Sequence, residues 1–96
     1  MNEELRFGRG SANPARLRAA LEAVLAEPDL RGRDDLPDRV EVREDGQGID
    51  PIAVTVVITL VRLTGRMATS VWDDVLWPRL RRRLDDDALG ERRDDR

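Results

Sequence analysis

The stretch from Asp50 to Leu63 constrains the fold of this chain more than any other segment. It reads Asp-Pro-Ile-Ala-Val-Thr-Val-Val-Ile-Thr-Leu-Val-Arg-Leu, and most of its side chains are aliphatic. Such a run must be buried, and a chain of 96 residues has little core in which to bury it. The stretch therefore predicts either a tightly covered element or a surface that a partner, a second copy or a membrane covers.

The beginning of this stretch favours a helix over a strand. Its Val, Ile and Thr content is typical of strands. However, Asp50 is a preferred N-cap, and Pro51 fits the first helical position because its missing N–H would be unpaired there. The run is also about twice as long as a typical strand. A helix would gather its polar side chains into one narrow stripe: Thr55, Thr59, Arg62 and Arg66. We therefore predict a helix from Pro51 to Leu63 that is apolar around most of its circumference.

The rest of the pattern predicts a small α+β or α/β domain in the order β-α-β-α(-α). Alternating apolar residues predict short strands at 4–8 and 38–43. Asn13 followed by Pro14 predicts the start of a helix over 14–27. Two strands joined through a helix are most simply parallel, with a right-handed crossover. Two strands make a poor sheet alone, which again indicates pairing with a partner or a second copy.

Two arrangements stay open for the residues after 63. Ser70 with Asp73 three residues later matches a capping box, which would start a third helix at Val71. The alternative is one bent helix from 51 to about 86, bending near Gly65 and kinked at Pro78. The tail 85–96 is strongly charged and is predicted to fray, so the domain is assigned to residues 1–84.

The composition excludes much catalytic chemistry. All 17 basic residues are Arg, and His, Cys and Tyr are absent. The chain therefore lacks a disulfide, a thiol nucleophile, an imidazole base and a Schiff-base amine. Glu44, Asp45 and Asp50 are the candidates for a carboxylate cluster, but their spacing matches no Ca²⁺ loop and is typical of an N-cap and a solvated turn. We expect no enzymatic activity, no cofactor and no metal.

Charge and the N-terminus bear on partners and location. A net charge of −3 gives no global field that favours nucleic acid. The basic run is also locally balanced, because on a helix Asp85, Asp86 and Asp87 would lie four residues beyond Arg81, Arg82 and Arg83. Nucleic-acid binding is therefore not expected. The first residues are acidic and contain no apolar signal core, so we expect a cytoplasmic protein.

The apolar and aromatic residues predict an interaction surface for a protein partner or a second copy. On the predicted helix Val54, Ile58 and Val61 would flank the intrachain face, and Trp72 and Trp77 would act as anchors. A basic patch lies beside them: Arg79, Arg81, Arg82 and Arg83. The alternative is a peripheral membrane-surface element that uses residues 52–63, the two Trp residues and the Arg run.

Two segments resemble a known family. Residues 17–33 read Leu-Arg-Ala-Ala-Leu-Glu-Ala-Val-Leu-Ala-Glu-Pro-Asp-Leu-Arg-Gly-Arg, and the part from Glu27 to Gly32 matches most closely. The second segment is the predicted helix that ends near Trp77 and the Arg run. Over roughly residues 5–83 the chain resembles the small actinobacterial proteins called effector-associated constant component. The resemblance implies a non-enzymatic adaptor that links effector domains, such as peptidases or nucleotide-cleaving modules, to sensing components in bacterial conflict systems. It carries over no catalytic residues.

The chain also departs from the pattern of that family. Val24 or a neighbour stands where the family usually carries a Trp in its first helix. The middle of the chain is β-branched instead of Gly- and Ala-rich. An acidic-basic tail stands where a closing strand often follows the Arg run.

Overall fold

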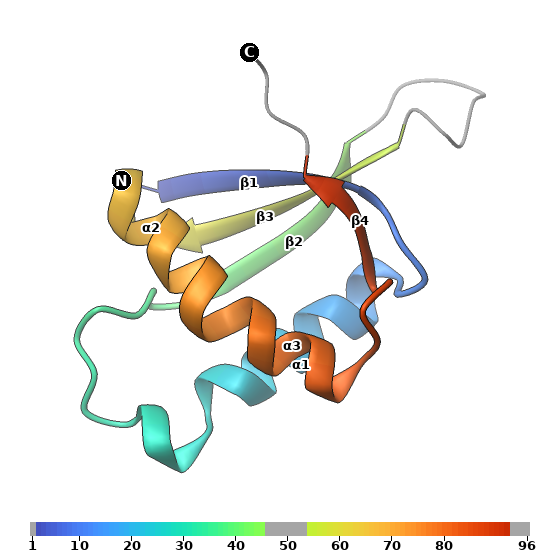
Figure 1. Cartoon of the computed structure of the whole chain (residues 1–96). Helices are drawn as coiled ribbons and strands as arrows, with labels where there is room; N and C mark the ends of the chain where they lie inside the picture. Colours follow the sequence, from blue (N-terminus) through green and yellow to red (C-terminus); the bar gives the residue numbers. More distant parts are fainter. Residues whose placement is uncertain (1, 46–53, 93–96) are drawn as a thin grey trace.

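The protein is an α+β domain in which a four-stranded antiparallel sheet carries helices on one face (Figure 1). The computed structural model describes residues 2–45 and 54–92. In chain order the elements are β1 (Asn2–Arg9), α1 (Pro14–Leu25), the 3₁₀ turn η1 (Pro28–Leu30), β2 (Val40–Asp45), β3 (Thr55–Val61), α2 (Gly65–Val71), the π-helical turn η3 (Trp72–Leu76), α3 (Trp77–Arg83) and β4 (Leu89–Arg92). The strands lie side by side in the order β2-β3-β1-β4.

The aliphatic stretch forms the central strand β3, so the predicted helix is wrong over Thr55–Val61. Its proposed start at Asp50 and Pro51 lies outside the described residues. β3 pairs with β1 over its whole length and with β2 from its first residue to Leu60. Val56, Ile58 and Leu60 are fully buried in the core beneath the helices. The β-branched side chains pack well on a pleated surface that is covered on both faces, and here this packing outweighs the capping signal.

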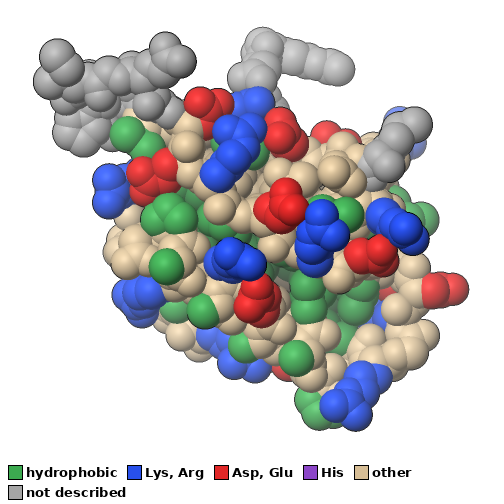
Figure 2. All heavy atoms as spheres, turned by 180° about the vertical axis from the view of Figure 1, so that it is seen from behind, with side chains coloured by type: hydrophobic (Ala, Val, Ile, Leu, Met, Phe, Trp, Pro, Cys, Tyr) green, Lys and Arg blue, Asp and Glu red, His purple; other side chains and the backbone are tan. Residues whose placement is uncertain are grey.

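Charged side chains cover the opposite face of β3. Val57, on that face, is fully buried between Arg6 of β1 and Arg43 of β2. These two arginines form ion pairs with Glu4 and Asp45, and their aliphatic stems lie along the strand. Figure 2 shows the molecule from behind, with basic and acidic side chains interspersed over the surface and hydrophobic atoms between them. The protein thus buries both faces of its most apolar segment with one helical layer and one layer of paired charges.

The predicted helix after Asn13 and the two predicted short strands are confirmed. The side chain of Asn13 accepts a hydrogen bond from the Arg16 N–H at 2.8 Å, and Pro14 begins α1. Both predicted short strands are present as β1 and β2, but they are not neighbours and not parallel. β3 lies between them and is antiparallel to each, because the segment that was assigned to a helix supplies the third strand.

The helical unit is continuous from Gly65 to Arg83, so neither predicted arrangement is correct. It begins after Arg62, which has φ 71°, and the Glu3 carboxylate accepts a hydrogen bond from the Gly65 N–H at 2.8 Å. Ser70 lies inside α2 and starts no new helix. Pro78 lies in the first turn of α3, directly after the π-helical turn.

The tail that was predicted to fray contains an ordered strand. Residues Leu89–Arg92 form β4, which pairs antiparallel with β1 at the edge of the sheet. The preceding loop is held by backbone hydrogen bonds from Ser11 to the Asp87 carbonyl and from Ala12 to the Ala88 carbonyl. The domain therefore extends beyond residue 84, and residues 93–96 lie outside the described part of the chain.

The position of Ile58 gives a direct test of the central strand. Ile58→Ala should lower the free energy of unfolding by about 2–4 kcal/mol, because it removes fully buried side-chain atoms and leaves a cavity. Urea denaturation followed by circular dichroism measures this change. The control Met67→Ala, at a side chain that is 56% exposed, should change stability by no more than about 0.5 kcal/mol. Similar small effects for both variants would contradict this placement of Ile58.

The backbone at Arg62 gives a second stability prediction. Arg62→Gly should be more stable than Arg62→Ala by about 1 kcal/mol, because a φ of 71° strains any residue that has a Cβ atom. Both variants remove the exposed ion pair between Arg62 and Asp38, so the comparison isolates the backbone term. Thermal denaturation of the two variants measures it, and equal stability would count against a left-handed conformation at residue 62.

Candidate functional site

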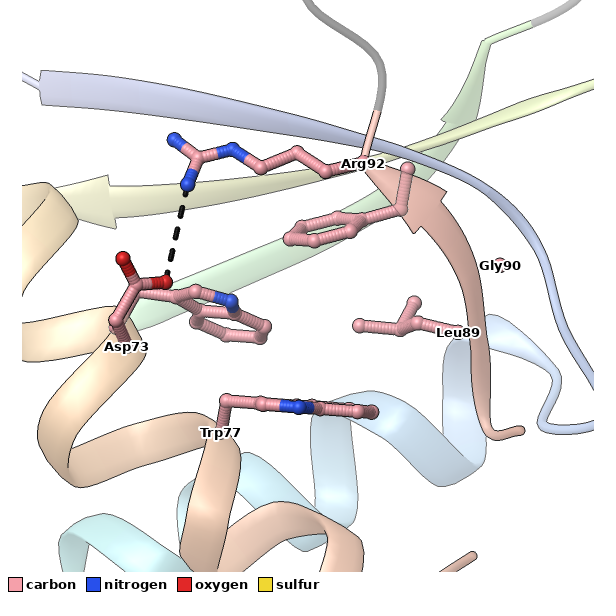
Figure 3. A pocket seen from close by; sticks show the side chains of 7 residues that line it. Asp73, Trp77, Leu89, Gly90 and Arg92 are labelled. Atoms are coloured by element: carbon pink, nitrogen blue, oxygen red, sulfur yellow. Dashed lines mark ion pairs between the residues drawn. The ribbon is translucent and has the colours of Figure 1, made fainter. Parts of the chain in front are cut away.

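All three aromatic side chains of the chain meet at one surface pocket between the helical unit and β4. The ring centroids of Phe7 and Trp72 are 5.2 Å apart, and those of Trp72 and Trp77 are 6.1 Å apart with nearly parallel planes. The pocket has a volume of about 220 Å³. Figure 3 shows side chains that line it. Its lining residues come from β1, the helical unit and β4: Phe7, Trp72, Asp73, Trp77, Leu89, Gly90 and Arg92. We call this site the aromatic pocket.

The π-helical turn brings the two indoles together. In an α-helix, residues five apart point in directions about 140° from each other. Here the Trp77 N–H donates to the Trp72 carbonyl, which closes a wider turn over five residues and puts both side chains on one side. The following Pro78 has no N–H to donate to the carbonyl four residues before it, so the wider turn also accommodates the proline. The π-helical turn thus both accommodates Pro78 and places the two indoles side by side.

A β-bulge aims the residues of β4 at the same pocket. Arg9 pairs with Leu89 but Phe7 pairs with Arg92, so β4 contains one residue more than β1 between these two pairs. The extra residue turns the side chains of both Leu89 and Arg92 toward the helical unit (Figure 3). Gly90 lies close to the backbone of β1, because a Cβ atom on Gly90 would come within 2.8 Å of Gly8. A larger residue at position 90 would push β4 away from β1.

The aromatic pocket has an apolar floor and a polar rim. Trp72 and Leu89 are buried, and Trp77 is half-buried. At the rim the Arg92 guanidinium lies 3.8 Å from the Asp73 carboxylate, and the two side chains are 34% and 56% exposed. Asp73 and Arg92 are the only titratable side chains in the lining. The volume is below the roughly 300 Å³ at which small-molecule sites usually begin, so the pocket suits one large apolar side chain better than a cofactor.

The structure separates the residues that were predicted to form an interface. Ile58 and Val61 are buried in the sheet and cannot form a contact surface, because they belong to the central strand instead of a helix face. Val54 precedes β3 and is half-buried. Trp72 and Trp77 do lie together, at the pocket. Phe7, Leu89 and Arg92 were not predicted as site residues, and the sequence of β4 has no recognisable strand pattern.

The predicted basic patch is divided by ion pairs. Arg79 donates to Glu27 and, at 2.7 Å, to Asp29, while Arg83 donates to Glu27 at 3.0 Å. These contacts connect α3 to η1 and to Glu27, which directly precedes η1. Asp87 instead accepts a hydrogen bond from the Ser11 hydroxyl. The predicted balance by residues 85–87 is wrong, because the helix ends at Arg83. Arg81 and Arg82 are exposed and, among the described residues, form no ion pair.

The ion pairs shift the titration of the acidic partners. Hydrogen bonding from Arg79 lowers the pKa of Glu27 below its usual value, with a further contribution from Arg83 and partial opposition from desolvation. Hydrogen bonding from Arg79 also lowers the pKa of Asp29. Glu27 is only 20% exposed, so this contact is partly shielded from water. We call the group of Glu27, Asp29, Arg79 and Arg83 the Arg–acid clasp.

Comparisons with protein-family models, curated proteins and solved structures find no match for this chain. Within residues 2–45 and 54–92, no helix is long and apolar enough to cross a membrane. The same residues contain no cluster of three or more acidic side chains arranged to hold a metal ion. Of the carboxylates considered for such a cluster, Asp45 pairs with arginines and Asp50 lies outside the described residues.

The clasp predicts a pH dependence of stability. The pKa of Glu27 is lower in the folded protein than its usual value of 4.5, so the stabilisation is fully present above about pH 4.5 and is lost as the pH falls through the lowered value. Glu27→Gln should therefore be less stable than the original protein at pH 7, by on the order of 1 kcal/mol. The difference should shrink as the pH falls below about 4.5.

Urea denaturation of both proteins at neutral pH, near pH 5 and near pH 3 measures this difference. Glu22→Gln, at an exposed position in α1 that pairs with Arg18, is the matched control and should have a smaller effect. A difference between the Glu27 variant and the original protein that stays constant with pH would contradict the assigned ion pairs.

Proposed function

We propose that this protein is a non-enzymatic interaction module, an adaptor that holds an extended segment of a partner protein beside β4. An apolar side chain of that segment would enter the aromatic pocket. The observation that carries the proposal is the convergence of Phe7, Trp72 and Trp77 on one pocket at an edge strand. Aromatic side chains in pockets are the usual anchors of protein interfaces.

The position of β4 supports an extended partner. β4 is the last strand of the sheet, and among the described residues only β1 pairs with it. An added strand would hydrogen-bond to the outer side of β4, and every second side chain of that strand would face the helical unit. Main-chain bonds would then provide affinity, and the aromatic pocket would provide selectivity for one apolar side chain.

The chemistry of the aromatic pocket supports binding over catalysis. Its lining contains no Ser, Thr or other hydroxyl nucleophile, and its titratable groups are one carboxylate and one guanidinium. The chain also has no His or Cys. Asp73 and Arg92 at the rim suit the N–H and C=O groups of a bound backbone, since one accepts and the other donates hydrogen bonds.

The family resemblance supports the same conclusion. The two segments that resemble effector-associated constant component are joined in this structure by the clasp, since Glu27 and Asp29 belong to the first and Arg79 and Arg83 to the second. In addition, β4 follows the Arg run, as a closing strand often does in that family. The resemblance implies an adaptor between effector domains and sensing components, and the proposed partner segment would belong to one of these.

Selection from a phage-displayed library of random peptides tests the proposal. We expect selected peptides to share one large apolar residue and to change the intrinsic fluorescence on titration, because both Trp residues of the chain line the aromatic pocket. Trp77→Ala should weaken the binding of these peptides by roughly tenfold or more, since it truncates the half-buried anchor.

Met67→Ala is the control, since Met67 is exposed on the same helical unit and does not line the pocket. It should leave peptide affinity unchanged. Peptides that bind the Trp77 variant as tightly as the original protein would place the binding surface elsewhere, and a failure to select any common motif would argue against an extended partner.

A further inference from the structure

The outer edge of β2, at the other side of the sheet from the aromatic pocket, carries a charge pattern that is complementary to itself. The residues 39–45 read Arg-Val-Glu-Val-Arg-Glu-Asp. On the face away from the helices, the side chains alternate in sign: Arg39, Glu41, Arg43 and Asp45. We propose that two copies of this chain pair through β2, antiparallel and centred on Val42, to form one continuous eight-stranded sheet.

Only one long register satisfies the charges. When Val42 faces Val42 of the second copy, Glu41 faces Arg43 and Arg39 faces Asp45. Sliding one strand by a single residue would put side chains on the wrong face. Sliding it by two residues centres the pair on Glu41 or on Arg43, and each of these registers sets like charges face to face. Opposite charges across a strand pair stabilise it and like charges destabilise it, so the pattern selects the register centred on Val42.

The backbone of β2 is oriented for this pairing. The Val61 N–H donates to the Arg39 carbonyl at 3.1 Å, so Val40 and Leu60 form a non-hydrogen-bonded pair. The N–H and C=O groups of Val40, Val42 and Glu44 therefore point away from β3. In the proposed register Val42 exchanges hydrogen bonds with its own copy, and Val40 does so with Glu44. The charged pairs then occupy the non-hydrogen-bonded positions, where facing residues are closest.

The side chains along the edge of β2 are exposed enough to contact a second copy. The side chains of Arg39, Glu41, Arg43 and Asp45 are between 49% and 68% exposed, so each can reach a second partner. On the helix side Val42 and Leu25 are only partly buried, although both pack against the core. Val42 would meet its own copy at the two-fold axis. Charged side chains on an edge strand usually hinder association. In the register centred on Val42, however, the charged side chains on the face away from the helices meet side chains of opposite sign.

The dimer is isologous, because the same surface is used by both copies. It does not use the aromatic pocket, so this inference stands or falls separately from the proposed function. The sheet and the helical layer also have similar widths, because four strands about 4.8 Å apart span nearly the same width as two helices packed about 8–10 Å apart. The helices of one copy therefore need not overlap those of the other when the two sheets join.

A charge-swap experiment tests the dimer. Light scattering and sedimentation velocity over a concentration series should show that the original protein dimerises, while Glu41→Arg and Arg43→Glu each dimerise at least roughly tenfold more weakly. In each of these variants both symmetry-related pairs become repulsive. Mixing the two variants should restore a dimer, because one chain is then positive and the other negative at both positions 41 and 43. The double variant E41R/R43E should also dimerise.

Asp86→Arg provides the matched control for Glu41→Arg, because it makes the same change of charge at an exposed residue in the loop before β4. It should dimerise as the original protein does, and circular dichroism should show that every variant is folded. The inference is overturned if the original protein stays monomeric at millimolar concentration, or if the two single variants associate no better with each other than with themselves.

Discussion

Burial of β3 on both faces is the constraint on which the rest of this structure depends. The strand is the most apolar segment of the chain, and on its face away from the helices Val57, Thr59 and Val61 are also buried. The helices formed by residues 2–45 and 54–92 cover one side of this strand. The other side is covered by arginine stems and carboxylates from the neighbouring strands, whose mutual ion pairs keep the charges solvated at their tips. The high content of Arg and of acidic residues is thus part of how the sheet is covered.

The helical unit is attached to the rest of the protein on both sides of its π-helical turn. Before the π-helical turn, α2 is fixed to β1 by the Glu3 carboxylate at the Gly65 N–H. After it, α3 is fixed to the segment that follows α1 by the Arg–acid clasp. A regular helix would direct Trp77 away from Trp72 and would also change the facing of Arg79 and Arg83. The extra residue of the π-helical turn changes the facing of everything that follows it, so the aromatic pocket depends on this turn as much as on the aromatic residues themselves.

Local sequence signals were sufficient to predict the elements that have one buried face and one solvent-exposed face. The cap at Asn13 identified α1, and alternation identified β1 and β2, because their outward side chains are charged. The sequence of β3 does not alternate strictly between apolar and polar residues, so its hydrophobic periodicity cannot distinguish a buried strand from a buried helix. The helix-start signal at Asp50 and Pro51 therefore led to the wrong prediction. β4 is held by contacts with residues 7–12, far away in sequence, and only Leu89 carries an apolar signal. The two Trp anchors could therefore be named from the sequence, whereas the pocket that contains them could not.

The two edge strands of the sheet, β2 and β4, differ in their side chains and therefore suit different binding partners. The β2 edge is charged, nearly neutral in sum and complementary to itself, and therefore favours another copy of the same chain. The β4 edge lies beside the aromatic pocket and favours an apolar side chain from a different protein. If both proposals are correct, the strand order places the two pockets of a dimer at the far ends of one sheet. A partner that presents two segments, or two partners that are themselves linked, would then bind with an effective concentration set by that spacing. An adaptor built in this way gains avidity without a larger interface.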